Sequence, residues 1–353
     1  MKRIVICYDG TWNKQTSTDP TNVLRFHDSV HPSTEGGNGP DQLRLYVPGV
    51  GTEWYDKWLG GLLGYGLGAN IVKGYQFLVE NYEDGDEIYI LGFSRGAYTA
   101  RSLVGLIRNC HLPHQRHGWI ISNIAYYIYR VRWGGADTFM ARRFRKRYSR
   151  EVPIKFLGVW DTVGALGIPL TCFNFLNYWF FRFHDTKLSS IVESAYQAVA
   201  LDEHRKQFAA SLWSLKDGEE PDHRQSIEQR WFVGGHSDVG GGNETPEFSD
   251  LTLRWMQDKA AARGLELTPV EVKPADFEAK FPDSYARFPN VPVLGPIYRR
   301  FSSRHSRPVS TSKLDVECLD PSIEGRRLAN RSYTPTNKVL PDLVEQQLEA
   351  STL

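Results

Sequence analysis

Short apolar runs that end in turn residues recur along the chain and constrain its fold more than any other feature. The runs cover residues 4–8, 43–47, 87–92, 154–160 and 230–233. Stretches with apolar residues at helical spacing cover residues 70–82, 95–108 and 250–263. Strands buried on both faces are nearly continuous in apolar residues, and they occur in parallel sheets between helical layers. The sequence therefore predicts an α/β fold with a mostly parallel sheet and helices on both faces.

We expect one domain over residues 1–340, with two insertions and a short tail over residues 341–353. The first insertion, residues 115–150, is expected to be helical with a basic end, and the second, residues 165–190, is rich in aromatic residues. Both are expected to lie over the carboxyl edge of the sheet, where open α/β sheets bind ligands. The Pro-rich region that starts at residue 268 is expected to wrap around the core.

Composition and charge exclude several classes of protein. With 42 basic and 41 acidic residues the formal net charge is +1, so no nucleic-acid partner is expected. The four cysteines are scattered and form no CxxC pair, which favours reduced thiols. The sequence has no signal-peptide pattern and no run of about 20 apolar residues, which predicts a cytoplasmic protein and leaves signal-independent export open.

The segment from Gly92 to Gly96 reads GFSRG and fits the pattern G-x-S-x-G. It begins where a predicted strand ends, and a predicted helix starts directly after it. Small residues on either side of the serine allow a sharp turn that lifts its hydroxyl clear of the sheet. We interpret Ser94 as a nucleophile, with the backbone N–H of Arg95 aimed at the oxyanion. The alternative is a Gly-Ser turn that only starts a helix.

A serine nucleophile needs a base, and the base needs an orienting acid. Among ten histidines, only His236 follows an apolar strand directly and lies in a Gly-rich loop, which makes it the candidate base. Asp161 ends the strand over residues 154–160 and is the candidate acid. Asp238 is its rival, with bracing of the His loop as the alternative role. The order Ser, Asp, His is characteristic of α/β-hydrolases.

Four segments resemble the type VI secretion phospholipase effector family. They are CYDGTWN (7–13), LGFSRGAYTAR (91–101), GVWDTVGALG (158–167) and FVGGHSDVGGG (232–242). The resemblance runs in order over most of the chain and implies an α/β-hydrolase-like domain whose nucleophile, acid and base fall on Ser94, Asp161 and His236. Effectors of this family hydrolyse acyl esters of phospholipids. We therefore expect a serine esterase of phospholipase type that needs no metal or organic cofactor, with a secretion-system or immunity protein as a partner.

The turn after the first predicted strand, Asp9-Gly10-Thr11, is the candidate for a second oxyanion donor. The amides of Gly10 and Thr11 would supply it, and Asp9 would brace the loop. The alternative is that these residues simply turn the chain.

Two other functions compete with the serine esterase. Asp9, Asp161, His236 and Asp238 all follow predicted strands and offer the hard O and N ligands of a metal-dependent phosphoesterase. The other competing function is a non-catalytic binding module on a hydrolase scaffold.

Two further runs leave alternatives open. The basic run comprises Arg142, Arg143, Arg145, Lys146, Arg147 and Arg150. It is interpreted as the solvated face of a helix, as a peripheral membrane contact that meets anionic headgroups, or as a nucleic-acid patch without a recognised motif. The aromatic run at residues 173–183 is either core or oligomer contact, or an acyl-binding lid. The preferred ester and the oligomeric state do not follow from the sequence.

Overall fold

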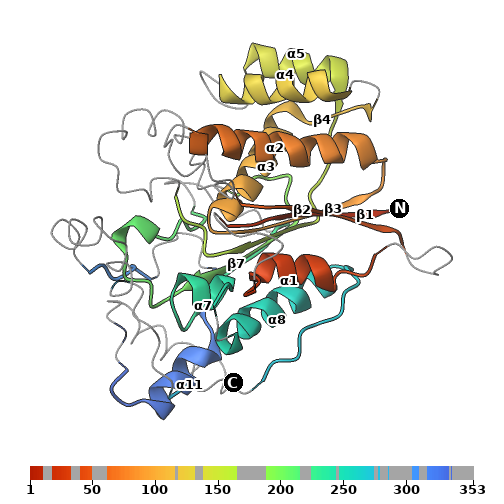
Figure 1. Cartoon of the computed structure of the whole chain (residues 1–353). Coiled ribbons are helices and arrows are strands. Elements are labelled where there is room, and N and C mark those ends of the chain that lie inside the picture. Colours follow the sequence, from red (N-terminus) through yellow and green to blue (C-terminus); the bar gives the residue numbers. More distant parts are fainter. Residues whose placement is uncertain are drawn as a thin grey trace.

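A parallel sheet lies at the centre of the protein (Figure 1). The computed structural model describes residues 1–10, 18–32, 40–49, 62–115, 118–131, 138–164, 188–214, 224–243, 246–273, 277–278, 285, 304–309, 316–333 and 335. In these ranges the sheet has seven strands, in the order β2-β1-β3-β6-β7-β8-β9, and every neighbouring pair is parallel. Their bounds are β1 (Arg3–Tyr8), β2 (Gln42–Val47), β3 (Glu87–Phe93), β6 (Phe156–Trp160), β7 (Ser194–Ala200), β8 (Ser226–Phe232) and β9 (Glu317–Leu319). The predicted α/β fold with a mostly parallel sheet is confirmed.

Helices cover both faces of this sheet (Figure 1). One face carries α2 (Leu62–Asn81) and α3 (Arg95–Cys110), and the other carries α1 (Asn22–Ser29) and α8 (Glu247–Ala261). The interior strand β1 shows how the sequence specifies this arrangement. Ile4 and Ile6 belong to the core shared with α2 and α3, whereas Val5 and Cys7 belong to the core on the side of α1 and α8. Successive strand residues point to opposite faces, so a strand between two helical layers must be apolar throughout.

The helical segment that follows α3 forms an outer layer over α2 and α3, and the prediction that residues 115–150 cover the carboxyl edge is wrong. This segment contains α4 (Gly118–Arg130) and α5 (Phe139–Tyr148), which pack on each other and on α2 and α3 (Figure 1). It starts and ends at the amino edge, where β4 (Leu112–Pro113) pairs with β5 (Ser149–Arg150). There the guanidinium of Arg150 donates to the carbonyl of Tyr82, just before β3. The inner apolar face of α4 is therefore buried by helices and not by the site.

The C-terminal part of the chain adds the strand at the edge of the sheet opposite β2. The short strand β9 pairs with β8 at the edge, and α11 (Pro321–Ala329) follows it. Residues 304–309 run past the end of β7, where the N–H of His305 donates to the carbonyl of His204. The aromatic run at residues 173–183 and the tail at 341–353 lie outside the described residues, so their roles stay predictions. In the described part of the chain, no helix combines the length and the apolar character needed to cross a bilayer.

Candidate active site

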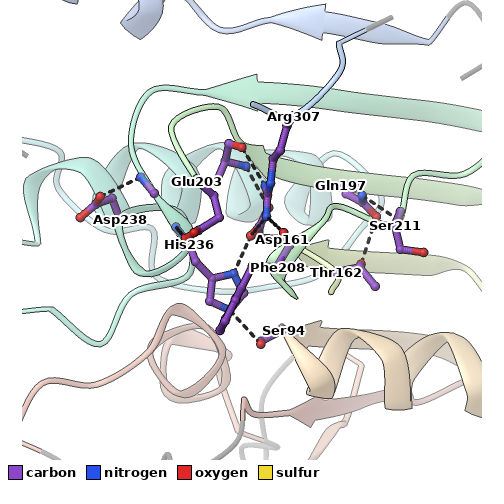
Figure 2. A network of polar contacts seen from close by, with 12 residues as sticks. Ser94, Asp161, Thr162, Gln197, Glu203, Phe208, Ser211, His236, Asp238 and Arg307 are labelled. Atoms are coloured by element: carbon purple, nitrogen blue, oxygen red, sulfur yellow. Dashed lines mark hydrogen bonds and ion pairs between the residues drawn. The ribbon is translucent and has the colours of Figure 1, made fainter. Parts of the chain in front are cut away.

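Three side chains from three strand ends meet at the carboxyl edge of the sheet (Figure 2). Ser94 follows β3, Asp161 follows β6, and His236 follows β8. The Nε2 atom of His236 lies 2.8 Å from Ser94 Oγ, and its Nδ1 atom lies 2.5 Å from Asp161 Oδ2. Ser94 and His236 are each 6% exposed while Asp161 is fully buried, so access to the site is through the serine and the imidazole. The structure thus brings together the three residues that the sequence singles out.

The turn that presents Ser94 requires the two glycines of the motif. Ser94 has φ 57° and ψ −120°, a conformation that non-glycine residues rarely adopt. A Cβ atom on Gly92 would lie 2.5 Å from the carbonyl oxygen of Gly96. A Cβ atom on Gly96 would lie 2.2 Å from the carbonyl oxygen of Tyr8 in β1. Only hydrogen fits at both positions, which lets α3 start directly at the end of β3 and close to β1.

Asp161 is held by a dense set of donors. Its backbone also has a positive φ of 40°. Arg307 binds the carboxylate in a bidentate manner, with Nη1 2.5 Å from Oδ1 and Nη2 2.9 Å from Oδ2. The N–H of Ala200 donates to Oδ1 at 3.0 Å. Arg307 is itself 1% exposed and also donates to the carbonyls of Ala200 and Phe208. Bidentate pairs of this kind fix geometry as well as charge.

These contacts set the protonation states of the acid and the base. Burial opposes the charge of Asp161, but the charge of Arg307 and the hydrogen bond from His236 outweigh it and hold the pKa of the carboxyl well below its usual range. Burial lowers the pKa of His236, and this effect outweighs the hydrogen bond and charge of Asp161, which favour the imidazolium. At neutral pH the pair is therefore a carboxylate and a neutral imidazole. The Nδ1–H group then donates to Asp161, and Nε2 is left to accept the serine proton.

Aromatic rings enclose the imidazole. The ring of Phe93 lies 4.7 Å and the ring of Phe208 4.9 Å from the ring of His236, between centroids. The buried carboxylate of Glu203 accepts the backbone N–H of His236 at 3.3 Å and forms an ion pair with Arg205 at 2.8 Å. Burial opposes the charge of Glu203, but the hydrogen bonds and charge of Arg205 outweigh it and lower its pKa to about 2. The base is thus fixed at its ring and at its backbone.

Asp238 lies near His236 in sequence but braces the loop. Its Oδ2 accepts the N–H of Gly235 at 2.8 Å, and its Oδ1 accepts the side-chain amide of Asn243 at 2.7 Å. Burial raises its pKa against the effect of the hydrogen bond from Gly235. This is the loop-bracing arrangement considered as the alternative to a role as the acid.

The turn after β1 does not fit the predicted role of Gly10. The N–H of Gly10 donates to Asp9 Oδ1 at 2.6 Å, so that amide is occupied. Asp9 Oδ2 accepts the hydroxyls of Thr21 at 2.7 Å and Tyr46 at 2.6 Å. Asp9 therefore braces β1 against α1 and β2, as the sequence suggests. The other candidate donor, Thr11, lies outside the described residues.

The metal alternative would require Asp9, Asp161, His236 and Asp238 to share one site. Asp161 and His236 contact each other, whereas Asp9 is bound to Thr21 and Tyr46, and Asp238 is bound to its own loop. Within the described ranges, no three His, Cys, Asp or Glu side chains gather so as to hold a metal ion. The four residues do not form the ligand set that this alternative needs.

Sequence reasoning missed two residues of the site, Arg307 and Glu203. Arg307 lies in a turn-rich stretch that carries no pattern, and no signal in the sequence connects it with Asp161. Glu203 lies just beyond β7, and a carboxylate after a strand is a signal that was usable. The apolar-run pattern does not predict β7 as a strand, because β7 includes the polar residues Ser194 and Gln197.

A parallel sheet with a Ser–His–Asp line at its carboxyl edge has the site layout of serine hydrolases. The chain belongs to the family described as T6SS, phospholipase effector Tle1-like, catalytic domain, whose model matches residues 2–259. The predicted membership of the type VI secretion phospholipase effectors is confirmed. Ser94, Asp161 and His236 lie within the matched residues, and Arg307 lies beyond them.

The chain is similar to a yeast protein in sequence and to two solved structures. An uncharacterized protein of Saccharomyces cerevisiae is 30% identical over 230 residues, a match that covers 59% of this chain and 32% of the relative, so the chain spans about a third of that protein. A solved structure of an uncharacterized protein from Pseudomonas aeruginosa is 18% identical with a TM-score of 0.46, over 80% of this chain and 49% of the other. The structure of the Tle1 effector bound to the VgrG spike from the type 6 secretion system is 18% identical with a TM-score of 0.43, over 69% of this chain and 51% of the other.

Proposed function

We propose that this chain is a serine hydrolase that cleaves carboxylic ester bonds through an acyl-enzyme. The observation that carries the proposal is the continuous hydrogen-bonded line from Ser94 Oγ through the His236 ring to Asp161. The lowered pKa values of Asp161 and His236 support an ionised acid and a neutral base at neutral pH.

In the acylation step, Ser94 Oγ attacks the acyl carbonyl while His236 Nε2 takes its proton. Asp161 keeps the proton of the ring on Nδ1 and stabilises the imidazolium that forms. The backbone N–H of Arg95, at the start of α3, is the proposed donor to the oxyanion. The imidazolium then gives its proton to the leaving alkoxide, which departs as an alcohol.

In the deacylation step the same groups act in reverse. His236 takes a proton from water, the hydroxide attacks the acyl carbonyl, and the proton returns to Ser94 as the acid is released. Arg307 is the proposed positioning residue, since it fixes both oxygens of Asp161 without contacting the reacting atoms.

Membership of a phospholipase effector family supports phospholipids as the substrate class. Apolar rings beside the base fit an acyl substrate, because Phe93 and Phe208 place apolar surface against the imidazole. The same membership supports a type VI secretion component as the partner.

Activity-based labelling tests the proposal directly. A fluorophosphonate probe should label the native protein at Ser94, and a panel of soluble esters and phospholipids should reveal turnover that Ser94→Ala lowers by roughly 10⁴–10⁶-fold. The Ser94→Ala protein is the blank for contaminating esterases.

Two results would contradict the proposal. Turnover that a chelator abolishes, without labelling of Ser94, would favour the metal-dependent phosphoesterase. Ligand binding that Ser94→Ala leaves unchanged, with no ester turned over by the native protein, would favour the binding module.

A further inference from the structure

The hairpin of α4 and α5 carries most of the exposed apolar side chains in the described part of the chain. Among all the described residues, nine large hydrophobic side chains are exposed, and seven of these nine lie on the hairpin. The seven are Trp119, Ile120, Ile124, Tyr127, Val131, Phe139 and Met140. Exposed apolar residues normally occur singly on a protein surface, and a group of them marks an interaction site.

The fold explains only the inner side of α4. Ala125 and Ile128 are buried in the core shared with α2 and α3. Ile120, Ile124 and Tyr127 recur at the spacing of one helical face and are exposed by 65%, 43% and 61%. An apolar outer face is not needed to hold α4 on the sheet, so it requires a different explanation.

Positive charge lies beside this apolar face. The described residues of the hairpin, 118–131 and 138–150, contain seven Lys or Arg residues and no Asp or Glu. Since the whole chain has a net charge of only +1, this concentration is local. The outward positions of α5 are Arg142, Arg143, Lys146 and Arg147, all exposed. We call these four cations and the seven apolar side chains the hairpin surface.

We propose that the hairpin surface binds the face of an anionic phospholipid bilayer. Interfacial helices combine an apolar face that includes aromatic and aliphatic side chains with Lys and Arg that meet acidic headgroups. Trp119 and Tyr127 suit the headgroup level, where amphipathic rings collect. Nucleic acid would match the cations but would leave the apolar face in water.

One end of the hairpin surface lies on the same side of the molecule as the candidate active site. Figure 1 shows α5 alongside α4, and since its last residue leads into the amino edge, where Arg150 pairs with Leu112, its first residues lie toward the carboxyl edge. Phe139 and Met140 at that end therefore lie on the side of the molecule that carries Ser94. Bilayer binding itself goes beyond the proposed function and does not depend on it.

Vesicle co-sedimentation tests the inference. The full chain carrying Ser94→Ala, which leaves lipids intact, is mixed with vesicles of phosphatidylcholine alone or of phosphatidylcholine with phosphatidylglycerol. We expect binding to the anionic vesicles, little binding to the neutral ones, and partial loss as salt is raised.

Paired substitutions locate the binding surface. Arg142→Glu with Arg143→Glu should weaken binding to anionic vesicles by about 30-fold or more, since each cation contributes strongly near such a membrane. Ile120→Asn with Ile124→Asn should remove the part of the binding that survives high salt. The matched control is Arg327→Glu with Leu328→Asn on α11, where both side chains are also exposed, and it should bind as the parent does.

Other outcomes would overturn the inference. These are the absence of any preference for anionic vesicles, equal binding by the hairpin variants and the parent, or a change of oligomeric state in the hairpin variants, which would make the surface an interface between copies. To check that the hairpin variants fold, the same substitutions are made in the protein with its native Ser94. Turnover of a short soluble ester by these proteins then reports folding. Vesicle binding without any ester turnover would contradict the proposed function and leave this inference standing.

Discussion

Asp161 faces two cationic partners at once, the imidazolium that would form during catalysis and the permanent charge of Arg307. The bidentate contact of Arg307 orients the carboxylate, but its positive charge also reduces the pull of Asp161 on a proton at His236. Burial acts on His236 in the same direction. Both effects favour the neutral imidazole of His236 over the imidazolium.

The two aspartates near His236 are expected to behave differently on substitution. Asp161→Asn should lower kcat by about 10⁴-fold, because the amide no longer holds the correct imidazole tautomer. Asp238→Asn should cost far less, because the carboxylate of Asp238 accepts hydrogen bonds from Gly235 and Asn243 in its own loop. Steady-state kinetics on one soluble ester, with thermal unfolding as the check on folding, compares the two variants. Equal losses, or a loss confined to Asp238→Asn, would mean that the acid is assigned to the wrong residue.

Substitution of Arg307 should change the pH profile as well as the rate. Arg307→Gln removes the cation that opposes the imidazolium, so the acid limb of kcat/KM should move to higher pH, with kcat lowered and KM little changed. It also leaves a buried carboxylate less well paired, at a cost of about 3–5 kcal/mol in unfolding free energy.

Arg307→Lys keeps the charge and should restore the position of the acid limb but not the full rate, because a lysine cannot make the bidentate contact. The control is Arg304→Gln, at an exposed position of the same segment. An unmoved acid limb in Arg307→Gln would show that the residue is only structural.

The sequence predicts those site residues that a local sequence pattern marks. Ser94, Asp161 and His236 each follow an apolar run, and Ser94 and His236 also lie in Gly-rich turns. Both patterns are visible in the sequence. Arg307 is joined to Asp161 across 146 positions, and no local property of its turn-rich stretch marks that contact.

At the scale of elements, the approach of α3 to β1 depends on the absence of a side chain at Gly96. In Gly96→Ala the new methyl would lie 2.2 Å from a backbone oxygen of Tyr8 and 2.5 Å from one of Asp9. We expect a loss of about 1–3 kcal/mol in unfolding free energy and slower fluorophosphonate labelling, because α3 and Ser94 must shift together. Gly105→Ala on the same helix is the control, since its methyl would meet the Tyr129 side chain and not a backbone. Unchanged labelling in Gly96→Ala would show that the turn tolerates the shift.

Elements were predictable where burial comes with apolar sequence. The strands β1, β3 and β6 are apolar on both faces and were recognised with nearly their observed bounds. The interior strand β7 is not predicted by an apolar run, because it buries the polar residues Ser194 and Gln197. The side-chain amide of Gln197 accepts a hydrogen bond from the hydroxyl of Thr162 and donates one to the carbonyl of Ser211. The place of the α4–α5 hairpin was also missed, because helical spacing does not tell which neighbour an apolar face packs on.

For the whole molecule, the burial of His236 should make stability depend on pH. Folding lowers the pKa of His236 from its usual 6.5. Below pH 6.5 the imidazole is therefore protonated in the unfolded chain but still neutral in the folded chain. Stability contributed by this group is present above pH 6.5 and is lost as the pH falls toward the folded pKa. The buried acids shift stability too, and with opposite signs, because the pKa of Glu203 is lowered whereas that of Asp202 is raised by burial.

A comparison with His236→Gln isolates the histidine from these acids. The difference in unfolding free energy, parent minus variant, should fall as the pH is lowered from 7.5 to 5, by at most about 1.4 kcal/mol per unit below pH 6.5. Urea unfolding at several pH values measures it, and the contributions of acids whose pKa His236 does not influence, such as Asp202, cancel. His31→Gln, at an exposed site, controls for the loss of an imidazole as such. A difference that stays constant over this range, or that grows as the pH falls, would show that the folded protein does not disfavour the imidazolium of His236. The neutral base that the proposed mechanism needs would then lack its physical cause.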